Sequence, residues 1–161
     1  MSATLLAVST PRWLTAKQER AWRHYRRMRT LLDLAIARDL RSDSSLSEAD
    51  YDVLSTLSES ADGSWRFRDL AARLLWSTSR LAHQVGRMQA RDLVERHRTH
   101  SDARGAIIAL TDHGRATLDA AAPLHVESVR RLLVDLLSPA EIEALDRIAA
   151  KVIDNLHQRG S

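Results

Sequence analysis

The sequence contains no cysteine, only three prolines and five glycines, and an aromatic content of 4% in 161 residues. Without cysteine there are no disulfides, no thiolate zinc or iron–sulfur sites and no thiol redox sensor, so we expect a cytoplasmic protein. The few prolines and glycines leave little room for flexible linkers, and the length suffices for one domain over 1–161. Because aromatic residues are scarce, a large sheet has few residues to build it.

Long hydrophobic runs are also missing. No segment approaches the roughly 18 apolar residues of a membrane span, and residues 1–8 lack the basic start and the length of a signal peptide. The chain is rich instead in leucine and alanine, with 24 and 23 residues, which favours helices. Arginine supplies 22 of the 24 cations, a skew typical of GC-rich bacterial genomes.

Positive charge is concentrated in the middle of the chain. Residues 64–104 carry nine arginines against four acidic groups, whereas residues 1–63 carry nine of each sign and residues 105–161 carry six basic and eight acidic groups. A solvated helix face gives such a pattern by chance, but a phosphate-binding module gives it as well. The charge distribution therefore favours nucleic acid as a partner.

Hydrophobic spacing predicts a mainly α protein with a small β-hairpin. Helices are predicted over 15–41, 47–57, 67–75, 77–91, 112–136 and 139–157, and the hairpin strands over 93–98 and 105–110. Thr15 with Gln18, and Ser138 with Glu141, have the spacing of capping boxes. Pro123 is expected inside the fifth helix as a kink, and a turn or short strand is expected after residue 58.

The order of elements across residues 47–110 is that of a winged helix-turn-helix. On the helix 77–91, Leu81, Val85 and Met88 share a face that should turn to the core. The other face then carries Arg80, His83, Gln84, Arg87 and Arg91. Arginine and glutamine match guanine and adenine edges in the major groove. The start of the helix offers hydroxyls for phosphate, from Ser77, Thr78 and Ser79.

Two motifs around this helix resemble those of the MarR family of transcriptional regulators, and the resemblance covers residues 15–157. Residues 87–96 read Arg-Met-Gln-Ala-Arg-Asp-Leu-Val-Glu-Arg, and residues 102–104 read Asp-Ala-Arg. A Leu-Thr-x-x-Gly run follows at residues 110–114. The family usually has glycine where this chain has Asp92, and aspartate tolerates the left-handed conformation at a helix end.

The resemblance implies a winged helix-turn-helix lobe over 47–110, flanked by dimerisation helices over 15–41 and 112–157. It also implies that Arg104 enters the minor groove and that Asp102 orients the wing. The residues expected to contact DNA are Ser77, Thr78, Ser79, Arg80, His83, Gln84, Arg87, Arg98, Asp102 and Arg104.

An obligate homodimer is a further implication of the resemblance, and the sequence agrees with it. Helices 112–136 and 139–157 carry apolar lines that are long for one small core, although packing against helix 15–41 of the same chain is an alternative. A two-fold dimer places the two copies of helix 77–91, the expected recognition helices, about 34 Å apart, so the operator should be pseudo-palindromic.

Similar regulators have an effector cleft between the dimerisation region and the DNA-binding lobe. The candidates to line it here are Trp22, Tyr25, Arg26, Tyr51 and Trp76. An arginine beside stacked rings suits a small aromatic or anionic effector. The alternative for these aromatic side chains is a place in the core.

The sequence thus predicts a ligand-responsive repressor that binds double-stranded DNA, with no cofactor and no enzymatic activity. His97 and His100 are spaced like metal ligands, but no third ligand completes a set. Ser101 with Asp112 and His113 resembles a triad only in composition, because a hairpin offers no oxyanion hole. A non-specific architectural DNA-binding protein and a winged helix used for protein contact remain the alternatives.

Overall fold

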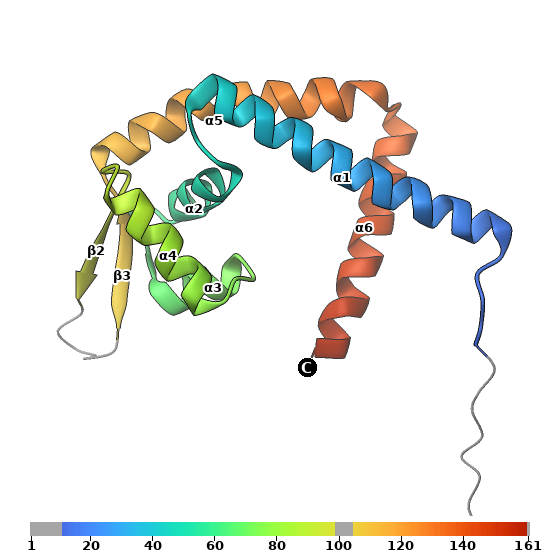
Figure 1. Cartoon of the computed structure of the whole chain (residues 1–161), viewed down its shortest axis with the longest axis horizontal. Helices are drawn as coiled ribbons and strands as arrows, with labels where there is room; N and C mark the ends of the chain where they lie inside the picture. The colour runs from blue at the N-terminus through green and yellow to red at the C-terminus, as the bar shows by residue number, and fades with distance from the viewer. Residues whose placement is uncertain (1–10, 99–104, 161) are drawn as a thin grey trace, which may run out of the picture.

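The computed structural model describes residues 11–98 and 105–160, apart from the side chain of Arg98, and it is mainly helical with one small antiparallel sheet (Figure 1). The elements are α1 (Ala16–Ser44), α2 (Glu48–Ser58), β1 (Ser64–Arg66), α3 (Phe67–Arg73), α4 (Thr78–Gln89), β2 (Val94–Arg98), β3 (Ala106–Leu110), α5 (Asp112–Leu132), the 3-10 helix η1 (Val134–Leu136) and α6 (Pro139–Gly160). The predicted fold class is confirmed.

Side-chain caps begin most of the long helices, as the sequence indicates. Thr15 and Gln18 form a reciprocal capping box at α1, and Ser47 and Asp50 form another at α2. Ser138 and Glu141 cap each other's backbone amides at the start of α6. Each cap gives partners to amides that have none within the helix.

The end of the fifth helix differs from the sequence prediction. The helix expected over 112–136 ends at Leu132, because Leu133 leaves helical geometry with φ −139° and ψ −60°, and η1 follows. Pro123 does lie inside α5, as expected. Of the turn or short strand expected after residue 58, the structure has the strand, β1. It joins the hairpin, so the sheet has the order β1-β3-β2, with Trp65 opposite Ile108.

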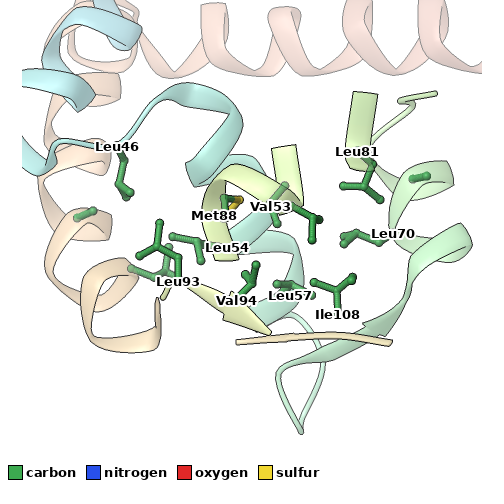
Figure 2. Close-up of a cluster of buried hydrophobic side chains, with 14 of the residues drawn as sticks. Leu46, Val53, Leu54, Leu57, Leu70, Leu81, Met88, Leu93, Val94 and Ile108 are labelled. Carbon is green, nitrogen blue, oxygen red and sulfur yellow. The ribbon is translucent and has the colours of Figure 1, made fainter. Parts of the chain in front are cut away.

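The hydrophobic core lies in the lobe formed by α2, α3, α4 and the sheet. Figure 2 shows its buried side chains, which come from these elements and their connections: Leu46, Val53, Leu54, Leu57, Leu70, Leu81, Met88, Leu93, Val94 and Ile108. All ten are fully or almost fully buried. The inner face of α4 is therefore packed in the core, and the outer face of α4 is exposed to solvent.

The two long helices α1 and α5 run beside each other above this lobe (Figure 1). Asp39 of α1 joins them, because its Oδ2 accepts hydrogen bonds from Ser128 Oγ and Arg131 Nη2 of α5, both at 2.6 Å. These bonds hold the pKa of Asp39 below its ordinary value against the opposing effect of burial.

The last helix, α6, turns down from the far end of α5 and stands apart from the lobe (Figure 1), and it buries none of its side chains from Pro139 to Arg159. Its exposed apolar residues are Leu145, Ile148, Val152, Ile153 and Leu156. On α1, Trp22, Met28, Leu31 and Leu34 are exposed as well. The chain on its own thus leaves large apolar surfaces on its two terminal helices uncovered.

Candidate nucleic-acid interface

A tight turn connects α3 to α4 and sets the direction of α4. The amide of Trp76 donates to the carbonyl of Ala71 at 2.9 Å, and the amide of Leu75 donates to the carbonyl of Ala72 at 3.1 Å. This is the double hydrogen-bond pattern of a Schellman motif, and Leu75 adopts the left-handed conformation that it requires, with φ 55°. Ser77 then caps α4 by accepting from the amide of Arg80.

The exposed side of α4 carries most of the residues predicted to contact DNA. Leu81, Val85 and Met88 are buried as predicted. The side chains that face solvent are those of Ser77, Thr78, Ser79, Arg80, His83 and Arg87. The helix therefore presents hydroxyls at its amino end, and two guanidinium groups and an imidazole along its length.

Arg80 is held in place on this surface by an aromatic ring. Its guanidinium carbon lies 4.0 Å from the ring centroid of Trp76, which is cation–π distance. Trp76 itself packs against the core with part of its ring. Arg80 is thereby supported at the exposed start of α4.

Gln84 corrects one of the predictions. It was expected on the exposed face, but it is only 2% exposed, and its Nε2 donates to Asp50 Oδ1 of α2 at 2.6 Å. Its Oε1 accepts from Arg87 Nη2. A buried amide with both ends hydrogen-bonded inside the protein has no free donor and acceptor pair for an adenine edge, so Gln84 is not placed to read bases.

Asp50 is the buried acid at the centre of these contacts, with 3% exposure. Burial acts to raise its pKa, but hydrogen bonds from Arg91 and Ser47 outweigh it and hold the pKa below the ordinary value. Arg91 Nη1 lies 2.8 Å from Asp50 Oδ2, and Arg91 Nη2 donates to the carbonyl of Ser45 at 3.2 Å. Arg91 is exposed, as expected, but its guanidinium is engaged with α2 and the α1–α2 connection.

The wing follows α4 directly. Asp92 adopts the left-handed conformation expected of it, with φ 55°, and its carbonyl accepts from Thr111 Oγ1 at 2.5 Å. Strands β2 and β3 pair along their length from Val94 opposite Leu110 to Arg98 opposite Ala106. Asp102 and Arg104, and the side chain of Arg98, lie outside the described residues.

The five residues expected to line an effector cleft make separate contacts. Trp22 and Tyr25 stack on α1 with ring centroids 5.7 Å apart, Tyr51 packs on His125 of α5, and Trp76 packs on Arg80. Arg26 is exposed beside the first pair on α1. A cavity of about 300 Å³ lies near the start of α1, but none of the five lines it.

The ring centroid of His125 lies 4.3 Å from that of Tyr51, where α5 meets α2. Burial lowers its pKa, only partly opposed by Glu48. Unfolding restores the ordinary pKa of about 6.5, so the unfolded chain binds the extra proton more readily. The stability contributed by neutral His125 is therefore complete at high pH and is lost as pH falls below about 6.5.

We expect the His125→Phe variant to lose less of its unfolding free energy between pH 7.5 and 5.5 than the wild type, because phenylalanine keeps the ring contact and does not titrate. Denaturant unfolding at several pH values measures the two slopes. Parallel slopes would contradict the lowered pKa, because they would mean that His125 binds its proton equally well in the folded and the unfolded chain.

Among the described residues no group of three histidine or acidic side chains is arranged to hold a metal ion. His100 and Ser101, which belong to the weak metal and triad patterns, lie outside them. No helix in the described part of the chain is both long and apolar enough to cross a membrane.

No family model and no curated protein matches the sequence. Solved structures do match it. AbsC, a MarR family transcriptional regulator from Streptomyces coelicolor, is 40% identical with a TM-score of 0.87, over 94% of this chain and 100% of that one. Sco3205, a MarR family regulator from the same organism solved in complex with DNA, is 36% identical with a TM-score of 0.87 over 92% of each chain.

A mutant MarR from E. coli, complexed with operator DNA, shares the fold at 21% identity and a TM-score of 0.74, over 86% of this chain and 99% of that one. The similarity to AbsC and Sco3205 covers 94% and 92% of this chain. With these relatives and this fold, the chain belongs to the MarR family of transcriptional regulators.

Proposed function

We propose that the protein is a homodimeric repressor that binds a pseudo-palindromic double-stranded DNA operator and acts by binding, not by catalysis, in the cytoplasm. The observation that carries the proposal is the exposed face of α4. There Arg80, His83 and Arg87 project from a helix whose inner face is fixed in the core. Sco3205, a relative at 36% identity, was solved in complex with DNA, which supports the same partner for this chain.

In this proposal α4 enters the major groove. Guanidinium groups donate to guanine edges in bidentate geometry, so Arg80 and Arg87 are the expected base-reading side chains. Ser77 Oγ is engaged as the helix cap, which leaves Thr78 and Ser79 to donate to phosphate. From the wing, Arg104 is proposed to enter the neighbouring minor groove while Asp102 orients the wing. Arg98 is proposed as a further DNA contact.

The dimer is proposed to form through the apolar surfaces of α1 and α6. Side chains such as Ile148 and Val152 are half or more exposed in the single chain. Uncovered apolar surface of this extent marks an interaction site. A two-fold axis through these helices lets both copies of α4 reach successive major grooves, about 34 Å apart.

Regulation is proposed to act on this spacing. A small aromatic or anionic effector, for which Trp22, Tyr25, Arg26, Tyr51 and Trp76 are the candidate contacts, would favour dimers whose α4 helices no longer fit the operator. A coupling of about 1–3 kcal/mol changes affinity by about 5-fold to 150-fold. No cofactor enters this scheme.

Two substitutions test the assigned roles. Arg80→Ala should weaken operator binding by about 1–3 kcal/mol and relax the preference at one base position, because Arg80 is expected to read a base. Arg104→Ala should weaken binding and lower the salt slope by about 1, because Arg104 is expected to bring a positive charge into the minor groove. Fluorescence anisotropy with operator variants at several salt concentrations measures both effects.

Arg130→Ala is the control, since Arg130 lies on α5 and pairs with Asp135 instead of facing the DNA. It should leave affinity and salt slope unchanged. If the Arg80 and Arg104 variants also matched the wild type while remaining folded, the helix and wing assignments would be wrong. Binding of DNA regardless of its sequence would favour an architectural DNA-binding protein. Binding that does not depend on salt concentration would favour a winged helix used for protein contact.

A further inference from the structure

Gln84 connects the buried acid of α2 to an exposed arginine of the recognition helix α4. Its Nε2 donates to Asp50 Oδ1 at 2.6 Å, and its Oε1 accepts from Arg87 Nη2. A carboxylate only accepts hydrogen bonds and a guanidinium only donates them. The amide therefore satisfies both neighbours in one orientation alone, with its nitrogen toward Asp50 and its oxygen toward Arg87.

Asp50 is itself fixed by contacts that do not involve Gln84. Its Oδ2 accepts from the amide of Ser47 at 2.9 Å and from Arg91 Nη1 at 2.8 Å. Asp50 is almost fully buried, and these bonds keep it ionised. The acceptor at the inner end of the chain of hydrogen bonds is thus held rigidly at the start of α2.

Arg87 is the outer end of the same chain. It belongs to the exposed face of α4, and a free arginine side chain has several rotatable bonds that DNA contact would have to order. The hydrogen bond to Gln84 orders the guanidinium before any DNA is present, and a side chain ordered in advance loses less entropy on binding.

We propose that Asp50 and Gln84 are positioning residues that hold Arg87 in the orientation in which it reads DNA, so that a buried contact with α2 sets sequence preference at one base step. The inference rests on the proposed function, because it needs Arg87 to contact a base. It assigns Gln84 a role in specificity without any contact of its own to DNA.

A double-mutant cycle tests this chain of hydrogen bonds from Asp50 through Gln84 to Arg87, which we call the relay. Gln84→Met keeps a side chain of similar size in the core but removes the acceptor for Arg87. The affinity for the operator should fall by about fivefold to tenfold, as expected for releasing one ordered arginine side chain. The salt slope should stay unchanged, because the charge of Arg87 remains. In an Arg87→Ala background, Gln84→Met should have no further effect on operator affinity.

Val85→Ala serves as the matched control, since it weakens the core under the same helix without touching Arg87. It should lower the unfolding temperature as Gln84→Met does, yet leave the base preference unchanged. Equal effects of Gln84→Met in both backgrounds would overturn the relay and leave Gln84 a purely structural residue. So would a base preference of Gln84→Met identical to that of the wild type.

The outcomes separate this inference from the function on which it depends. If the wild type shows no sequence preference at all, the proposed function fails and the relay fails with it. If the wild type selects an operator and Arg87→Ala does not alter the preference, Arg87 reads no base. The relay and the base-reading role of Arg87 are then overturned, and specific operator binding stands.

Discussion

Replacing Gly114 with alanine should destabilise the protein by about 3 kcal/mol or more, because the new methyl group has no space. A Cβ built at Gly114 lies 1.9 Å from the carbonyl oxygen of Leu93 and 2.8 Å from its carbonyl carbon. Both atoms belong to the backbone at the start of the wing, so no side-chain rotation relieves the overlap. Either α5 or the strand must move.

The clash explains the glycine of the Leu-Thr-x-x-Gly motif. Thr111 accepts from the amide of Gly114 and also donates to the carbonyl of Asp92, which holds the first turn of α5 against the end of α4. Such close approach of two backbones requires a residue without a Cβ. The motif therefore fixes the position of the wing relative to α4.

Gly86→Ala is the matched control for this prediction. Gly86 lies inside α4, and a Cβ there meets nothing within 4 Å. Alanine should stabilise the helix by about 0.5–1 kcal/mol. Denaturant unfolding of the two variants should thus give changes of opposite sign, and equal effects would contradict the close packing of α5 on Leu93.

The second large effect is expected from charge in the apolar surface of α6. The double variant Ile148→Asp with Val152→Asp should be a monomer in analytical ultracentrifugation, because two carboxylates would be buried in the proposed dimer interface. Operator affinity should fall by roughly 100-fold or more, since a monomer binds only one half-site and loses the gain from linked binding.

The winged-helix lobe should remain folded in this variant, because α6 contributes no buried side chain to it. Glu143→Ala is the control, since Glu143 is exposed on the same helix. It should leave both the mass in solution and the operator affinity near those of the wild type. A double variant that stays dimeric would place the interface elsewhere. One that is monomeric but binds the operator with wild-type affinity would contradict the need for two linked half-sites.

The sequence predicts the fold well where its signals are local. Capping pairs such as Thr15 with Gln18 and the spacing of Leu81, Val85 and Met88 depend on residues within one helix, and the structure confirms them. The end of α5 is less clear from the sequence, because leucines continue through η1 at helical spacing. Leu133 breaks the helix there by a change in backbone angles that composition does not reveal.

The candidate site depends more on contacts between distant residues. Gln84 follows Arg80 by four residues and precedes Arg87 by three, so the helical pattern places it with the exposed cations. Its burial is decided by Asp50, 34 residues earlier in the chain, which needs a donor inside the lobe. The one local hint is that Gln84 also lies beside Val85 and three residues from Leu81, at the edge of the apolar stripe.

Recovery of genomic fragments by the purified protein at about 150 mM salt tests the central claim most directly, because non-specific phosphate contacts are substantially weakened at that ionic strength. A dimeric, sequence-reading repressor should recover a small number of sites that share an inverted repeat, with half-sites centred about one helical turn apart. Even recovery of fragments regardless of sequence would contradict specific operator binding. Recovery of no DNA by folded, dimeric protein would contradict a role of this surface in binding DNA.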